Sequence, residues 1–265
     1  MAQKSLKEMA QTRRAKLGTF LVEFNTPGIG QIMAAAGCDY VLLDMEHSGF
    51  SFDTLKSMLR YMQAAELPTI VRVPSRNYHH IARALDMGAE GLMLPMVSSG
   101  EEAEQIAAHA KYPGQGHRGV ALQVAHDRYQ PGPVLKKLRD ANKRSTIFAQ
   151  IESPDGVANA DDIAAVKGID CLWIGHFDLS ASMGIPGQFD HPDFKAAVKC
   201  VGRACQKHKK SFGRLVPDVK TGAALHRQGF DFICYSGDVW IFQAALKDGI
   251  DQLRAKCKGG RAKKR

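Results

Sequence analysis

Eight short apolar runs alternate with stretches of helical periodicity along most of this chain. Strands that alternate with helices are typical of a parallel sheet, because each parallel strand needs a crossover connection, usually a helix. Eight strands also close a (β/α)₈ barrel, a fold of about 250 residues. We therefore predict an α/β fold with a single (β/α)₈ TIM barrel; a doubly wound open sheet is the alternative. The expected strands span residues 17–24, 40–44, 69–73, 91–96, 146–152, 171–177, 211–216 and 230–236.

The expected helices lie between these strands and after the last one. They span residues 28–36, 52–65, 78–87, 101–110, 134–141, 156–166, 192–208, 219–228 and 239–256. Residues 111–133 interrupt the alternation, since they contain many glycines and prolines and show no clear helical pattern. Long irregular segments in a compact domain are usually functional loops. This one precedes the fifth strand, so we expect it to pack beside a neighbouring element rather than to form the catalytic face by itself.

The formal charge of +9 is concentrated at the C-terminus. Residues 254–265 carry seven positive side chains and no acid, so the rest of the chain is nearly neutral. We therefore expect a barrel domain over residues 1–253, a basic, disordered tail over residues 254–265, and no nucleic-acid partner. The six scattered cysteines contain no C-x-x-C pair, which favours the reducing cytoplasm. No apolar run reaches the roughly 18 residues of a membrane span, so we expect no membrane partner.

Two carboxylates follow consecutive strand-like runs, Glu152 after TIFAQI and Asp178 within CLWIGHFDLS. The C-terminal ends of barrel strands meet at one face, so we expect the two carboxylates to converge. A pair of carboxylates with open positions suits an oxygen-preferring divalent cation such as Mg²⁺ or Mn²⁺. The alternative is that each is a helix cap or an ion-pair partner at a strand–helix turn.

A second group of polar side chains follows the second and third strands. Asp44, Glu46 and His47 stand at the end of the run YVLLD, and Arg72 stands near the end of TIVRV. Because imidazole titrates near neutrality, His47 is the candidate general base. Arg72 is a candidate clamp for a carboxylate or a developing enolate, and Asp44 is a further catalytic candidate. The alternatives are a histidine packed in a loop and a structural ion pair between Arg72 and one of the two acids.

Lysine placement distinguishes imine chemistry from metal-assisted enolate chemistry. A Schiff-base enzyme needs a buried lysine at a strand end, and none of the expected strands carries a lysine. Metal-assisted enolate chemistry is therefore favoured over imine chemistry. Asp218 and Asp238 occupy helix-entry positions after the seventh and eighth strands, where barrels often bind phosphate. An aspartate cap competes with an anion for the same N–H groups, so a phosphorylated substrate is not indicated.

In their order and spacing, several motifs resemble those of the HpcH/HpaI family of class II pyruvate aldolases. They are LLDMEH, VRVPS, ALDMGAEGLMLPMV, GHRGV, QIES and GHFDLSASMG, and the resemblance runs from about residue 17 to residue 253. It implies a barrel whose C-terminal helix is exchanged between the subunits of a trimer or hexamer. It also implies metal ligation by Glu152 and Asp178, with pyruvate held by Gln150 and by the backbone around Phe177 and Asp178.

The same resemblance assigns roles at the other strand ends. It implies that His47 is the base, that Arg72 contacts the substrate and stabilises the transition state, and that Asp86 raises the basicity of the histidine. Without the resemblance, the sequence indicates only that Asp86 lies at the end of a helix. The sequence departs from the family pattern at His176 and Phe177, which add bulk beside the implied metal ligand. The preference for the aldehyde is therefore not carried over.

Together these features predict a divalent-metal-dependent aldolase, a carbon–carbon lyase of sugar-acid or aromatic-compound catabolism, with Mg²⁺, Mn²⁺ or Co²⁺ as cofactor. Such an enzyme reversibly cleaves 4-hydroxy-2-oxo acids to pyruvate and an aldehyde by way of a metal-stabilised pyruvate enolate. One alternative is a related metal-dependent lyase acting on a CoA thioester, although the sequence shows no evident nucleotide site. The other is a non-catalytic binding protein that uses the basic tail.

Overall fold

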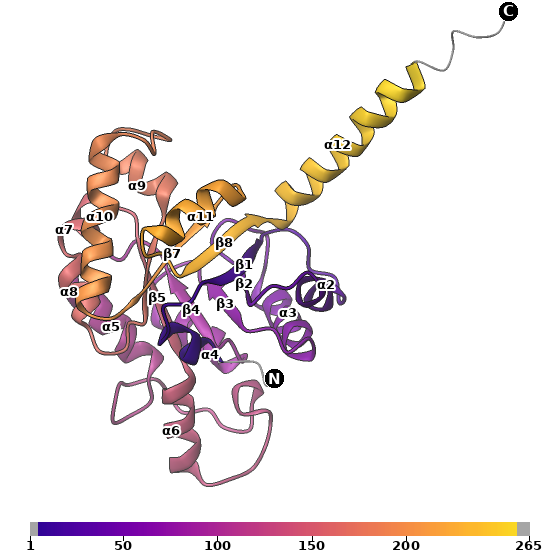
Figure 1. Ribbon diagram of the computed structural model, residues 1–265. Coiled ribbons are helices and arrows are strands. Elements are labelled where there is room, and N and C mark those ends of the chain that lie inside the picture. Colours follow the sequence, from indigo (N-terminus) through magenta and orange to yellow (C-terminus); the bar gives the residue numbers. More distant parts are fainter. Residues whose placement is uncertain (1–4, 259–265) are drawn as a thin grey trace, which may run out of the picture.

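The expected strands form one closed barrel of parallel strands in the computed structural model, which describes residues 5–258 (Figure 1). The strands are β1 (Lys16–Leu21), β2 (Tyr40–Asp44), β3 (Thr69–Arg72), β4 (Gly91–Leu94), β5 (Thr146–Ile151), β6 (Cys171–Ile174), β7 (Ser211–Val216) and β8 (Phe232–Gly237). Each strand pairs with the next along the chain, and β8 closes the barrel against β1. This order confirms the predicted (β/α)₈ barrel and excludes the open sheet.

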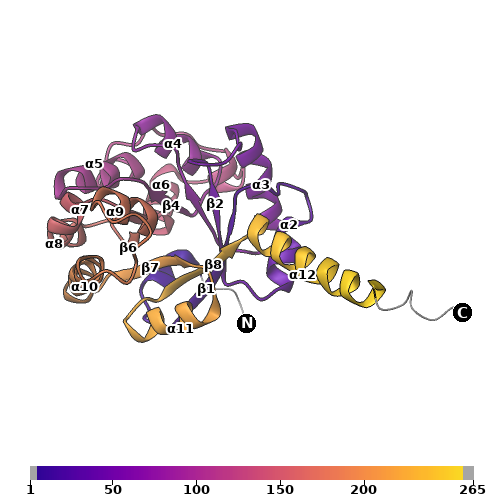
Figure 2. The same ribbon diagram turned by 90° about the horizontal axis from the view of Figure 1, so that it is seen from above.

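Helices surround the barrel and connect its strands (Figure 2). They are α1 (Leu6–Ala10), α2 (Ile29–Ala35), α3 (Phe52–Ala64), α4 (Tyr78–Asp86), α5 (Gly100–Ala110), α6 (Val134–Arg144), α7 (Pro154–Ala158), α8 (Ala160–Ala165), α9 (His176–Ser182), α10 (Pro192–Lys207), α11 (Val219–Arg227) and α12 (Asp238–Lys258). The expected helices are all found, except that residues 156–166 fall in two helices, α7 and α8. The sequence analysis does not predict α1 or α9, which have five and seven residues.

The barrel interior is filled by large apolar side chains and is covered at one end by α1. Leu6 and Met9 of α1 belong to the same buried cluster as Tyr40, Phe148 and Phe232. The rings of Phe148 and Phe232 meet edge to face, with their centroids 5.1 Å apart. A second, larger apolar core lies between the strands and the surrounding helices. Because α1 covers the end at which the strands begin, the polar side chains at the strand ends lie at the opposite face.

Residues 111–133 form an irregular segment that includes one short 3₁₀ helix, η1 (Ala125–Asp127). The segment packs against the C-terminal end of α4. Its buried Arg118 forms an ion pair with Asp86 there, and the guanidinium carbon of Arg118 lies 4.4 Å from the centre of the Tyr112 ring. The segment therefore packs beside a neighbouring helix, as expected.

The last helix, α12, leaves the barrel after β8 and extends away from it (Figures 1 and 2). Residues 254–258 are helical, so α12 extends past the expected boundary at residue 253. The rest of the expected tail, residues 259–265, lies outside the described residues. Exchange of α12 between subunits stays a prediction. Within residues 5–258, no helix is long and apolar enough to cross a membrane.

Candidate active site

Asp44 ends β2 and organises the turn that follows it. Its side chain is fully buried and accepts hydrogen bonds from the backbone N–H groups of Glu46 at 3.0 Å and His47 at 3.1 Å. It also accepts a hydrogen bond from Nε of Arg72 at 2.7 Å. This carboxylate therefore already accepts three hydrogen bonds from the protein. It positions its neighbours and has little capacity left for a ligand.

Arg72 ends β3 directly beside Asp44 in the parallel ladder. Its Nε contacts Asp44, and its Nη1 lies 3.2 Å from Oε2 of Glu46. The ion pair named above as the structural alternative is thus present, with both acids. Among residues 5–258, however, nothing accepts a hydrogen bond from Nη2. The pairs with the two acids fix the plane of the guanidinium, and Nη2 keeps donors for an anionic ligand.

Glu152 directly follows β5 and is a buried carboxylate, with an exposed fraction of 2%. Its Oε1 accepts a hydrogen bond from the backbone N–H of Met96 at 2.8 Å, and its Oε2 accepts one from Nε2 of Gln150 at 2.6 Å. Burial raises the pKa of Glu152 to about 7, and repulsion from Glu46 and Asp178 contributes to the rise. The three carboxylates therefore lie close enough to oppose one another's ionisation, which a bound cation would relieve.

Asp178 lies in the first turn of α9, which corrects the expectation that it ends the sixth strand. The strand β6 stops at Ile174, and α9 begins after Gly175. The side chain of Asp178 is exposed at this position. The helix is tied to Glu152, because the hydroxyl of Ser182 donates a hydrogen bond to the backbone carbonyl of Glu152 at 2.9 Å. A hydrogen bond therefore joins the helix that carries Asp178 to the backbone of Glu152.

Gly175 gives the Glu152 carboxylate the space it occupies. A Cβ atom at this position would lie 2.1 Å from Oε2 of Glu152 and 2.9 Å from Nε2 of Gln150. On the other side of the same amide, Oε1 of Gln150 is buried and has no hydrogen-bond partner among the described residues. A buried amide oxygen without a donor is costly, so this atom is available to a ligand or an ordered water molecule.

The residues around Glu152 fit a divalent cation in part. Two carboxylates, at Glu152 and Asp178, provide the hard oxygen ligands that Mg²⁺ and Mn²⁺ prefer. Within residues 5–258 no group of three His, Cys, Asp or Glu side chains is arranged to hold a metal ion. Such a cation would therefore need further oxygen ligands from substrate or water, which is the usual arrangement of a catalytic Mg²⁺ site.

His47 stands next to this cluster with its imidazole largely exposed. The side chain is 64% exposed, and its Nε2 lies 3.9 Å from Oε2 of Glu46, which is too far for a hydrogen bond. The packed histidine named above as an alternative is therefore not observed. Asp86 is placed elsewhere: it ends α4, paired with Arg118, and no described contact joins it to His47. Its role as the partner of the base has no support in the contacts of a single chain.

Phe177 and His176 form an aromatic surface beside Asp178. Their ring centroids are 4.6 Å apart, and both rings also meet Phe189, at 5.2 Å and 5.0 Å. Phe177 is 63% exposed, whereas His176 is buried. The contact of pyruvate with the backbone around Phe177 stays a prediction, and the aromatic cluster lies directly before Asp178 in the first turn of α9.

Three contributions to the site become visible only in the structure. Glu46, which the sequence offers only as an ion-pair partner, has a charge that acts on both Arg72 and Glu152. Met96 falls in an expected strand, but it adopts a left-handed backbone with φ of 55°, and its N–H binds Glu152. Gly175 stands out in the sequence only as part of a motif, and its glycine identity is the one signal for a close approach of another group.

Comparisons with known proteins identify the family of this chain. The sequence matches the HpcH/HpaI aldolase/citrate lyase family over residues 16–244. It is 34% identical over 224 residues to the 5-keto-4-deoxy-D-glucarate aldolase of Shigella boydii serotype 18, which covers 84% of this chain and 86% of that protein. The HpcH/HpaI aldolase of Desulfitobacterium hafniense DCB-2 superposes with a TM-score of 0.89 at 31% identity, covering 94% of this chain and 96% of that one. An HpcH/HpaI aldolase/citrate lyase family protein of Burkholderia cenocepacia J2315 gives a TM-score of 0.88 at 31% identity, covering 94% and 98%.

A closed barrel with a buried carboxylate of raised pKa, Glu152, at the end of a strand is typical of a (β/α)₈ enzyme. Within that class, the chain belongs to the HpcH/HpaI aldolase/citrate lyase family, because the family match spans most of its length. The resemblance inferred from the motifs is thereby confirmed. The expected enzyme class, a carbon–carbon lyase of the aldolase type, is confirmed with it.

Proposed function

We propose that this protein is a divalent-metal-dependent aldolase that reversibly cleaves 4-hydroxy-2-oxo acids to pyruvate and an aldehyde. The observation that carries the proposal is the environment of Glu152. This carboxylate is buried, its pKa is raised to about 7, and it lies beside Asp178 and the unpartnered amide oxygen of Gln150. Perturbed carboxylates at the strand ends of a barrel are typical of functional sites.

Glu152 and Asp178 would hold the cation. A divalent cation bound there would act as a Lewis acid toward the oxygens of a 2-oxo acid and would stabilise developing enolate charge. Mg²⁺, Mn²⁺ and Co²⁺ are the candidates. Arg72 binds the substrate carboxylate or the developing oxyanion through Nη2, while Asp44 holds its Nε in place. Gln150, through its unpartnered amide oxygen, and the backbone of the first turn of α9 at Phe177 would orient the bound acid.

His47 is the proposed base of the cleavage. It takes the proton of the 4-hydroxyl group as the bond between C3 and C4 breaks, and the bonding electron pair becomes the enolate of pyruvate. The aldehyde leaves, and protonation of C3 gives pyruvate. The exposed imidazole of His47 is accessible to a substrate hydroxyl, and the backbone hydrogen bond of His47 to Asp44 fixes the start of its loop.

The natural substrate is proposed to be a sugar acid. The relative from Shigella boydii acts, by its name, on 5-keto-4-deoxy-D-glucarate, and it shares a third of its residues with this chain. His176 and Phe177 depart from the family pattern beside the site, so the aldehyde fragment is the part of the substrate most subject to change. A cytoplasmic location stays a prediction.

The proposal is tested by replacing Glu152 with alanine. Pyruvate release from 4-hydroxy-2-oxo acids, followed with a coupled dehydrogenase and Mg²⁺, Mn²⁺ or Co²⁺, should be lost. Glu104→Ala is the matched control, because Glu104 is an exposed residue of α5 outside the site. A Glu152→Ala variant that keeps its full metal-dependent rate would refute the assignment.

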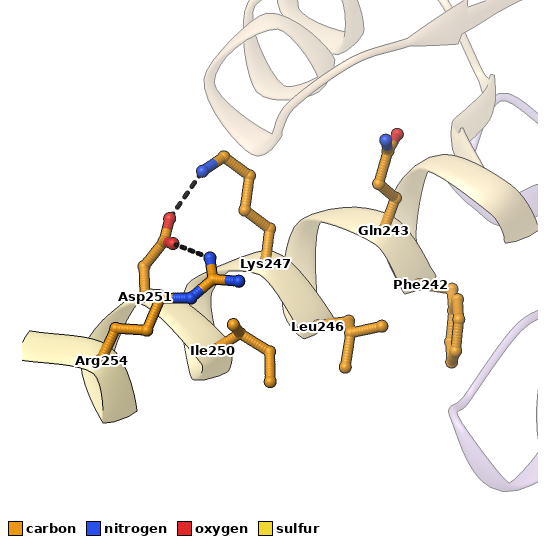
Figure 3. A pocket seen from close by; sticks show the side chains of 7 residues that line it. All are labelled: Phe242, Gln243, Leu246, Lys247, Ile250, Asp251 and Arg254. Atoms are coloured by element: carbon orange, nitrogen blue, oxygen red, sulfur yellow. Dashed lines mark hydrogen bonds and ion pairs between the residues drawn. The ribbon is translucent and has the colours of Figure 1, made fainter. Parts of the chain in front are cut away.

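We also propose that the protein is a homo-oligomer, a trimer or a hexamer, in which α12 packs against another subunit. Figure 3 shows Phe242, Leu246 and Ile250 along one side of this helix, and they are 57%, 53% and 39% exposed. Uncovered apolar faces of this kind usually mark protein interfaces. Leu246→Glu combined with Ile250→Glu should reduce the mass measured by light scattering, whereas Lys256→Glu should not. An unchanged mass would contradict the proposal.

A further inference from the structure

Arg214 is a buried cation on the outer side of the barrel. It belongs to β7, where the flanking Phe212 and Val216 join the core between strands and helices. The residue is 6% exposed, and its guanidinium carbon lies 5.2 Å from the ring centre of Phe189 and 5.5 Å from that of Phe194. These cation–π contacts stabilise the charge but accept none of its N–H hydrogen bonds.

No acid or carbonyl in the described part of the chain pairs with this guanidinium. Its Nε is buried without a hydrogen-bond partner. Burial lowers the pKa of Arg214 to about 10, with no nearby acid to oppose the shift. The other buried arginines behave differently, since Arg72 pairs with Asp44 and Arg118 pairs with Asp86. Buried charges are normally paired, so this one indicates a missing anion.

The guanidinium faces a large cavity whose rim is rich in positive charge. The cavity has a volume of about 1630 Å³ and lies between α10 and α11, bounded at one end by the start of α12. Its cationic lining residues besides Arg214 are Lys195, Lys199, Arg203 and Lys220, and its acidic lining residues are Asp190 and Asp218. Asp190 pairs with Lys195 at 2.8 Å and Asp218 caps α11, so the rim cations outside an ion pair among the described residues are Lys199, Arg203 and Lys220.

We propose that Arg214 and the cationic rim of this cavity form a binding site for a small organic oxyanion, a ligand that carries a carboxylate or phosphate group. The planar fork of arginine matches both groups and can bind either of them through two parallel hydrogen bonds. The aromatic wall, which includes Phe177, Phe189 and Trp240, favours a ligand with a carbon skeleton over an inorganic ion. The exposed lysines at the rim attract it.

This site is separate from the carboxylate cluster around Glu152, but the two share a wall. His176 and Phe177 line the cavity, and Asp178 follows them in the first turn of α9. Arg214 itself lies on the outer side of the strand, whereas its neighbour Gly213 faces Trp173 in the barrel interior. The anion therefore binds outside the barrel, next to the helix that carries a candidate metal ligand.

The experiment is calorimetric titration of the full chain, at constant ionic strength in chloride, with malonate, with phosphate and with malonamide as the neutral analogue of malonate. The wild-type protein should bind malonate, and more tightly than inorganic phosphate, but should not bind malonamide. Arg214→Met should weaken this binding by about ten- to a hundredfold, as expected for loss of charge-assisted hydrogen bonds. Arg214→Lys keeps the positive charge but loses the planar pair of donors. Its affinity should therefore lie between those of the wild type and Arg214→Met.

Arg227→Met is the matched control, because Arg227 is an exposed residue of α11 that does not line the cavity. It removes the same net charge and should leave binding unchanged. Arg214→Met should melt no lower than the wild type without added anion, since it removes a buried unpaired charge. Crystals soaked in selenate should show an anomalous peak within hydrogen-bond distance of Arg214.

The proposal is overturned if the wild type binds neither anion, or if Arg214→Met binds as the wild type does. It is also overturned if Arg214→Met dissociates an oligomer and no free anion binds, because Arg214 would then pair with a carboxylate of a second copy. None of these measurements depends on aldolase activity, so they test this binding site independently of the proposed function.

Discussion

Replacing Gly175 with alanine perturbs the candidate site through a single added methyl group. The new Cβ would lie 2.1 Å from Oε2 of Glu152 and 2.8 Å from its Cδ, whereas ordinary contact begins at 3.4 Å. The backbone at Gly175 has a negative φ of −82°, so alanine fits the local conformation and the conflict lies with the carboxylate. The Glu152 carboxylate must therefore move by about 1 Å away from position 175.

A displacement of about 1 Å at a catalytic group can lower the rate by roughly a hundredfold. Overpacking at a buried position costs about 1–3 kcal/mol of stability, so the barrel should still fold. The assay compares kcat/KM for pyruvate release and the affinity for Mn²⁺ between wild type and variant. Gly28→Ala is the matched control, since nothing lies within 4 Å of a Cβ at that position. Wild-type activity and Mn²⁺ affinity in Gly175→Ala would refute the placement of Glu152 described above.

Three further predictions concern ionisation and ion pairing. Burial raises the pKa of Glu152 to about 7 from 4.5, so the folded, metal-free protein keeps a proton there that the unfolded chain loses; its stability should therefore fall between pH 5 and pH 8, by up to about 3 kcal/mol. Urea unfolding in EDTA should show this slope for the wild type and a smaller one for Glu152→Gln, and equal slopes would contradict the burial of the charge. Arg72→Lys should lower kcat/KM by about ten- to a hundredfold, because lysine cannot bind Asp44 and a ligand in one plane; unchanged steady-state kinetics would speak against the clamp. Asp86→Asn should lower the free energy of unfolding by about 1–3 kcal/mol because it leaves the buried Arg118 without its counterion, and unchanged urea stability would disprove a structural role for the pair.

The barrel was predictable because its cause is local and repeated. Each strand is a short apolar run that a helix follows, so the order of elements predicts a parallel sheet and the number of strands favours a closed barrel over the open alternative. The boundary after β6 was not predictable in this way. The run CLWIGHF continues apolar past Ile174, and the strand ends there because α9 starts beside Glu152, a tertiary relation that no local pattern records.

The sequence predicted which residue types form the site, but it left open which of them pair with one another. Asp44, Glu46, Arg72 and Glu152 were identified because charged residues at the ends of apolar strands need partners. Which partners they find depends on the register between neighbouring strands, which sets Asp44 of β2 against Arg72 of β3. Asp86 was named from the resemblance alone, and the contacts of the single chain place it with Arg118 instead.

The most direct test of the account is a crystal structure of the full chain grown with Mn²⁺ and pyruvate. The anomalous signal of manganese should lie between the carboxylates of Glu152 and Asp178, with an oxygen of pyruvate within hydrogen-bond distance of Nη2 of Arg72. A manganese ion bound elsewhere, or a site in which the two carboxylates point away from each other and bind nothing, would contradict the central claim.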